Sequence, residues 1–114
     1  MAFSDIELER IDSVVGDLCR KRNRSEVSDQ LNLEYYVDHH DVVLFERRPA
    51  YSPFVGVVDS PVAKFKYVRT KDEWRLYWMR RDLKWHGYDM LLSSKDLSDL
   101  VAEVDEDPFC CFFG

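Results

Sequence analysis

Residues 61–90 concentrate the side chains of this 114-residue chain that are suited to binding anions. The segment holds eight basic and four acidic residues, a charge of +4, so the other residues must carry −10 to give the net charge of −6. It also holds all three tryptophans, together with Phe65, Tyr67, Tyr77 and Tyr88. Lysine and arginine bind phosphate or carboxylate groups, and aromatic rings stack or form hydrogen bonds. The segment therefore predicts an anion-binding surface.

Two strands, Val62–Thr70 and Trp74 to about Leu83, are predicted to form a hairpin there, joined around Lys71 and Asp72. If Thr70 lies opposite Glu73, the side chains divide between two faces. One face carries the pairs Arg69–Trp74, Tyr67–Leu76, Phe65–Trp78 and Ala63–Arg80, and the other carries Val68–Arg75, Lys66–Tyr77, Lys64–Met79 and Val62–Arg81. We expect the first face to be buried, because the opposite choice would bury the lysines.

The second face is the candidate binding surface. Its members are Lys64, Lys66, Arg75, Tyr77 and Arg81, and Arg80, Lys84 and His86 extend it where the strand ends. The partner would be acidic: a protein surface, a phosphorylated ligand or single-stranded nucleic acid. The same pattern also fits an ordinary solvated sheet face, on which long basic side chains cover apolar surface and pair with acids elsewhere.

An enzyme acting on a phosphoester or a similar anion is the alternative from another class, with Asp82, Lys84 and His86 performing the chemistry. A nuclease-like site needs at least two carboxylates facing a common ion, and the sequence places only Asp82 there. A pocket that encloses Asp82, His86 and a second carboxylate would favour the enzyme, whereas a flat exposed face would favour binding.

Other reactive residues give weaker patterns. His39-His40 and Cys110-Cys111 contain metal-ligand atoms, but neighbouring side chains point apart and no C-x-x-C spacing occurs. Cys19 is expected to pack in a helix, and no phosphate-binding or nucleophile-elbow motif is present. We therefore predict no metal, no cofactor and no catalytic residue, and we expect all three thiols to be free.

An amphipathic helix is predicted at the N-terminus. Ser4 and Glu7 have the spacing of a capping box, and Phe3 and Leu8 have that of a hydrophobic staple. An apolar stripe follows at the helical period, at Leu8, Ile11, Val14, Val15 and Leu18.

The remaining elements complete an α+β domain. Leu31–Val37 and Val42–Arg48 are predicted strands around a polar turn, and residues 55–58 form a short edge strand in the loop that follows. Ser93 or Ser94 would cap a second helix with the buried stripe Leu97, Leu100, Val101 and Val104, ended by Asp107-Pro108. We expect one domain over residues 1–114: an N-terminal helix, an antiparallel meander of about four to five strands, and a C-terminal helix on the same sheet face. The core would place Phe65, Tyr67, Leu76 and Trp78 against both helices, and the apolar C-terminal residues would dock on the body.

Composition limits the classes of protein. The net charge of −6 and the pI near 5.0 exclude a globally basic nucleic-acid binder. Neither a signal peptide nor a membrane-spanning run is apparent, and an odd count of three cysteines favours a reducing compartment. The expectation is a cytoplasmic protein that does not enter membranes, with a homodimer left open.

Several strings of residues resemble a bacterial family catalogued as domain of unknown function 3024. They are Phe45–Pro49, Val62–Lys64, Tyr67–Arg69, Trp74–Arg80, Asp82–His86 with Tyr88, and Val104-Asp105 through Phe112-Phe113-Gly114. The similarity covers nearly the whole chain but implies no activity, catalytic residue or cofactor. The pair Cys110-Cys111 departs from the Gly-Cys expected for the family, which weakens any role assigned to it.

Overall fold

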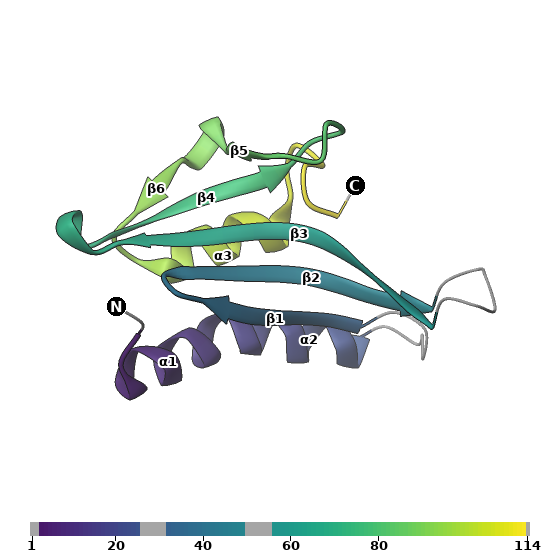
Figure 1. Cartoon of the computed structure of the whole chain (residues 1–114), viewed down its shortest axis with the longest axis horizontal. Coiled ribbons are helices and arrows are strands. Elements are labelled where there is room, and N and C mark those ends of the chain that lie inside the picture. Colours follow the sequence, from purple (N-terminus) through teal and green to yellow (C-terminus); the bar gives the residue numbers. More distant parts are fainter. Residues whose placement is uncertain (1–2, 26–31, 50–55, 114) are drawn as a thin grey trace.

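The computed structural model describes residues 3–25, 32–49 and 56–113 (Figure 1). The helices are α1 (Asp5–Ile11), the π-helical turn η1 (Asp12–Gly16), α2 (Asp17–Ser25) and α3 (Leu97–Glu106), with the 3-10 turns η2 (Arg69–Lys71) and η3 (Asp89–Leu91). The strands are β1 (Asn32–Asp38), β2 (Asp41–Pro49), β3 (Val57–Val68), β4 (Glu73–Met79), β5 (Trp85–Gly87) and β6 (Ser93–Ser94).

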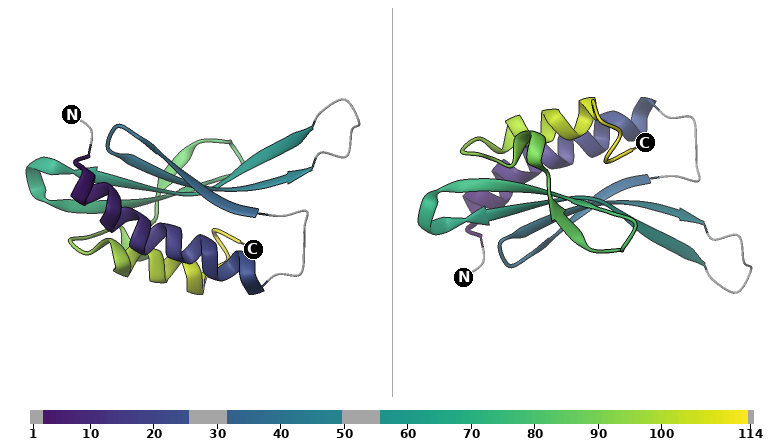
Figure 2. Two further views of the ribbon diagram at one scale, coloured as in Figure 1. Left: turned by 90° about the horizontal axis from the view of Figure 1, so that it is seen from below. Right: turned by 90° about the horizontal axis from the view of Figure 1, so that it is seen from above.

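The predicted α+β meander is confirmed. Strands β1 to β5 follow one another across an antiparallel sheet, and the short β6 pairs with β4 as well. Both views of Figure 2 show α1–α2 and α3 on the same side of this twisted sheet. The helices leave the other face of the sheet uncovered, and this uncovered face is called the outer face below.

The core lies between the helices and the sheet. Phe65 and Leu76 are fully buried there, and Tyr67 and Trp78 are partly buried against the same cluster. The helical stripe is buried as predicted at Ile11, Val15 and Leu18, with Val14 partly buried. Leu8 is the exception, because it remains 38% exposed, while Phe3 packs against the ring of Trp74.

The N-terminal helix begins with the predicted capping box. The Glu7 N–H donates to Ser4 Oγ, and the Ser4 N–H donates to Glu7 Oε1. The helical path through Ser25 is not regular, however, because the turn η1 within it is π-helical. A π turn changes the usual hydrogen-bond spacing of the helix, and side chains can bond the backbone groups that it leaves without partners.

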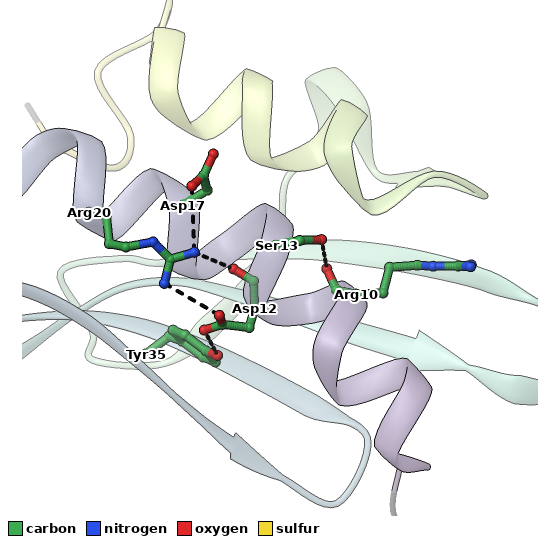
Figure 3. A network of polar contacts seen from close by, with 6 residues as sticks. All are labelled: Arg10, Asp12, Ser13, Asp17, Arg20 and Tyr35. Atoms are coloured by element: carbon green, nitrogen blue, oxygen red, sulfur yellow. Dashed lines mark hydrogen bonds and ion pairs between the residues drawn. The ribbon is translucent and has the colours of Figure 1, made fainter.

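Asp12 and Arg20 hold this turn in place (Figure 3). One Arg20 nitrogen donates to the Asp12 carbonyl at 3.1 Å, and another donates to the Asp12 carboxylate at 3.3 Å. The Tyr35 hydroxyl from β1 donates to the same carboxylate at 2.7 Å. This bond, followed by the Arg20 charge, lowers the pKa of Asp12, while burial and the Asp12 carboxylate raise the pKa of Tyr35 to about 12. The network therefore ties the helix to the edge of the sheet.

The C-terminal helix starts at a different cap from the one predicted. Asp96 is the N-cap, and its carboxylate accepts from the Ser98 N–H. Ser93 and Ser94 instead form β6, because pairing with β4 satisfies their backbone. The predicted stripe of this helix is buried, and the helix ends at Asp107 as expected. The Asp107 carboxylate then accepts the N–H groups of Phe112 and Phe113, which docks the C-terminal segment.

The β3–β4 register differs by two residues from the predicted one. Phe65 lies opposite Leu76, and the hairpin closes at Val68 opposite Glu73, around η2 and a left-handed Asp72. The Tyr67 hydroxyl donates to the Asp72 carboxylate across this longer turn. The predicted pairs are therefore wrong. Because the shift is even, the assignment of residues to faces is unchanged.

Strand β3 is also longer than predicted. It begins at Val57 and pairs there with the end of β2. Val57 and Val58, which were expected in a separate edge strand, therefore belong to β3. Val55 of that expected strand lies outside the described residues. A register shift in the β2–β3 pairing leaves Val62 without a partner beside Ala63. Both residues are buried in the core, as expected when a bulge adds one residue to a strand.

Candidate functional site

Four of the eight predicted binding residues meet on the outer face. The observed register places Lys64 opposite Tyr77 and Lys66 opposite Arg75, on adjacent central strands. Their neighbours Phe65 and Leu76 point to the helices, so these four side chains lie on the opposite side of the sheet. We call this group, with Trp85, the basic–aromatic face.

Trp85 is a member that the sequence analysis did not select. The Lys64 ammonium lies 5.1 Å from the centre of the Tyr77 ring and 5.5 Å from that of Trp85. Both distances lie within the range of cation–π attraction. The clustering of all tryptophans in residues 61–90 hinted at this role, but the short strand β5, which pairs Met79 with Trp85, brings Trp85 to the face.

Acidic groups partly balance this face. Arg75 Nε donates to Glu73 Oε2 at 3.2 Å. Lys66 lies between Arg75 on one neighbouring strand and Asp41 on the other. One Asp41 carboxylate oxygen is buried without a hydrogen-bond partner in the described part of the chain. Lys66 is exposed, so its ammonium is free to contact a partner.

The other four predicted residues surround the β4–β5 turn. Arg80 N–H donates to the Lys84 carbonyl at 3.2 Å, which closes the turn, and the Arg80 guanidinium lies 5.4 Å from the centre of the Trp78 ring. A cavity of about 590 Å³ opens beside it, between the end of β4 and the C-terminal segment. Its lining residues are Trp78, Met79, Arg80, Arg81, Asp82, Cys110 and Cys111.

The Asp82 carboxylate forms hydrogen bonds within and beside the β4–β5 turn. One carboxylate oxygen accepts the Lys84 N–H at 3.0 Å, and the other lies 2.8 Å from His86 Nε2. The bond with His86, the largest cause, helps lower the pKa of Asp82 below its ordinary value. His86 lies opposite Trp78 and lies outside the cavity lining, and Asp82 is the lone carboxylate among the described residues that line it. The second carboxylate that a nuclease-like site with a common ion would need is therefore absent from the described lining of this cavity.

Five of the six lysines and arginines in these two groups have no ion-pair partner among the described residues, Arg75 being the exception. Lys64, Lys66, Arg80, Arg81 and Lys84 form no ion pair within 4.0 Å among the described residues. Elsewhere in the described chain Arg20, Lys21, Arg22, Arg47, Arg48 and Arg69 each contact a carboxylate. Arg10, Lys71 and Lys95 likewise form no ion pair among the described residues, so these five cations are the largest group of unpaired ones there.

The three thiols lie in different surroundings. Cys19 is buried, Cys111 is intermediate and Cys110 is exposed, and all three are free. Burial raises the pKa of Cys19 to about 11, so its reactive thiolate is scarce at neutral pH. Within residues 3–25, 32–49 and 56–113, no three His, Cys, Asp or Glu side chains gather in a group that could hold a metal ion.

The comparisons with known proteins identify the family. Neither the curated proteins nor the solved structures include a significant match to this chain. The helices of the described residues are too short and too polar for one to span a bilayer. The family described as Domain of unknown function (DUF3024) matches residues 3–114, from the first capping residues to the C-terminal segment. This chain therefore belongs to the DUF3024 family.

Proposed function

We propose that this protein is a non-enzymatic binding domain that uses its basic–aromatic face and the β4–β5 turn to hold an acidic protein surface. The observation that carries the proposal is that five cations of β3–β5 have no carboxylate partner among the described residues. Exposed cations of this kind are neutralised by a partner more readily than cations already held in ion pairs.

The arrangement of Lys64 favours an acidic protein over single-stranded nucleic acid. Proteins that bind single strands offer open aromatic faces on which bases stack. Tyr77 and Trp85 are half-buried, and the Lys64 ammonium lies over both rings. Carboxylates from a protein need only the cations, and these remain accessible at Lys66 and Lys84.

Catalysis on a phosphoester has less support. It would require Asp82, Lys84 and His86 to act on a common substrate. Asp82 instead accepts a turn N–H and pairs with His86, and the adjacent cavity offers no second carboxylate from the described residues. The proposal therefore assigns Arg80, Arg81, Lys84 and His86 to binding.

Titration of the full chain with poly-L-glutamate, followed by isothermal calorimetry at low salt, tests the proposal. Binding should be modest and should weaken steeply as salt rises, because the Debye length falls to about 10 Å at 0.1 M. The double variant Lys66→Glu with Lys84→Glu should bind at least about tenfold more weakly. Both residues are exposed, so the fold should persist.

The control is Arg10→Glu with Lys95→Glu, two exposed cations outside the basic–aromatic face. Each of the two double variants lowers the net charge by 4, from −6 to −10, so both are repelled equally by the anionic probe at long range. Equal weakening in both variants, or no salt-sensitive binding by the unmodified protein, would overturn the proposal. Tighter binding of a single-stranded oligonucleotide than of poly-L-glutamate would replace the acidic protein with nucleic acid.

A further inference from the structure

A second cavity lies beside the β3–β4 turn, at the opposite end of β4 from the β4–β5 turn. It has a volume of about 570 Å³, within the range of small-molecule sites. Its walls come from α1 and η1, from the ends of β3 and β4 beside their connecting turn, and from the residues that begin α3. None of its lining residues belongs to the basic–aromatic face.

One wall of the cavity is aromatic. Tyr67 and Trp74 are cross-strand neighbours whose ring centres lie 5.0 Å apart. Trp74 also stacks on Phe3, with ring centres 5.6 Å apart and planes inclined by 18°. Phe3 is buried, so the indole is held in position before any ligand arrives. A fixed aromatic wall favours a flat ring as ligand, because less side-chain entropy is lost on binding.

The carboxylates of the cavity already have partners within the protein. Three acidic residues contribute to its lining, on α1, on the β3–β4 turn and at the cap of α3. Glu7 accepts from Ser4 and Arg69, Asp72 accepts from Tyr67, and Asp96 accepts from Ser98. The bonds to Glu7 and to Asp96 lower the pKa of each below its ordinary value, so both remain negative at neutral pH.

The cations of the cavity do not have such partners. Arg10 and Lys95 both line it, and neither forms an ion pair within 4.0 Å among the described residues. Arg10 contributes, after the hydrogen bonds from Ser98, to the lowered pKa of Asp96, so its charge acts on this cavity. Both side chains are exposed and can turn toward an anion at the mouth.

We propose that this cavity binds a small molecule consisting of a flat ring and one anionic group. The ring would lie against Trp74 and Tyr67, and the carboxylate or phosphate would be held between Arg10 and Lys95. The three carboxylates of the lining already accept hydrogen bonds within the protein, and their negative charge would repel a ligand with a second negative charge near the ring. This site is independent of the acidic-protein surface, and its test uses different residues and different probes.

The test is a titration of the ¹⁵N-labelled full chain, followed through the indole N–H signals. Two probes distinguish the sources of the anion: indole-3-acetate carries a carboxylate, and adenosine monophosphate carries a phosphate. At least one should shift the Trp74 signal in a saturable way while the Trp85 signal stays unchanged. Indole-3-acetamide, which keeps the ring but lacks the charge, should bind at least about tenfold more weakly than indole-3-acetate if the carboxylate is the preferred anion.

Variants complete the test. Arg10→Glu with Lys95→Glu should weaken binding of the active probe by at least about tenfold, whereas Lys66→Glu with Lys84→Glu should leave it within about twofold. The dispersion of the amide signals shows whether each variant is folded. The proposal is overturned if neither probe gives a saturable shift at Trp74, or if both double variants bind equally well.

Discussion

At the scale of single residues, Gly16 leaves room for the Asp12 carboxylate beside the π turn. A Cβ at this position would lie 2.4 Å from Asp12 Oδ1, which is closer than atoms approach without displacement. The absence of a side chain at Gly16 therefore lets the Asp12 carboxylate accept from both Tyr35 and Arg20. The hydrogen bonds of Asp12 drawn in Figure 3 therefore depend on residue 16 having no Cβ atom.

Gly16→Ala should destabilise the protein, although alanine is ordinarily the better helix residue by about 0.5–1 kcal/mol. The new methyl group displaces the Asp12 carboxylate and breaks its hydrogen bonds, a loss of roughly 1–3 kcal/mol that exceeds the propensity gain. Urea unfolding of both proteins measures the difference. Gly56→Ala is the matched control, because nothing lies within 4 Å of its added Cβ. A Gly16→Ala protein as stable as the control would refute this role.

At the scale of elements, Asp105 joins α2 to α3 within the helical layer. Lys21 Nζ donates to Asp105 Oδ2 at 2.6 Å, and Arg22 donates both to Oδ1 at 3.1 Å and to the Asp105 carbonyl at 2.9 Å. These bonds tie the last turn of α3 to α2. The Arg22 guanidinium also lies 3.7 Å from the centre of the Phe113 ring, so the C-terminal segment is tied to the same point.

Asp105→Asn should lower the unfolding free energy at neutral pH by about 1 kcal/mol, a small value because Lys21 is largely exposed. The Lys21 bond is the largest cause that holds the pKa of Asp105 below its ordinary value. The stabilisation is therefore complete above the unfolded pKa of about 3.9 and is lost as the pH falls through the lower folded pKa.

Unfolding curves at several pH values measure this effect. The unmodified protein should lose more stability on acidification than Asp105→Asn does, so the two curves should converge in acid. Glu106→Gln serves as the control, since this neighbouring side chain is exposed and forms no ion pair among the described residues. Parallel curves for the unmodified protein and Asp105→Asn would show that the ion pair does not contribute.

At the scale of the whole molecule, charge and burial are distributed unevenly. Lys64, Lys66, Arg80, Arg81 and Lys84 have no ion-pair partner among the described residues, whereas Arg20, Lys21 and Arg22 on α2 are held in ion pairs with acids of the helical layer. The exposure of the thiols also differs between the helical layer and the surface near the β4–β5 turn. Cys19 is 6% exposed between α2 and the sheet, and Cys110 lies at the surface beside the β4–β5 turn.

Thiol labelling should therefore report on the folding of the whole chain. A thiol reagent should modify Cys110 rapidly in the native protein, while Cys19 should react only through global unfolding, because the thiol is buried and its pKa is raised. In denaturant all three thiols should react. Mass spectrometry of the labelled peptides distinguishes the sites, and Cys110→Ser provides the control. Labelling of Cys19 at the native rate of Cys110 would contradict the observed packing.

The sequence by itself determined the α+β class, both helical stripes and the two faces of the β3–β4 hairpin. These features follow from local periodicity and from the cost of burying Lys64 or Lys66, and a register error of an even number of residues does not change them. The capping box of Ser4 and Glu7 was predictable for the same reason, since its partners lie three residues apart.

Only the tertiary structure decided which long-range partners meet. The register of β3 and β4 depends on the turn η2 and on the Tyr67–Asp72 bond, and Ser93 and Ser94 became a strand because β4 offered them a partner. Likewise, Arg10 and Lys95 are distant in sequence and meet at one cavity only when α1 and α3 pack on the same sheet face. Local propensity is a property of neighbouring residues, whereas contacts between residues distant in sequence depend on the loops and the packing that bring their segments together.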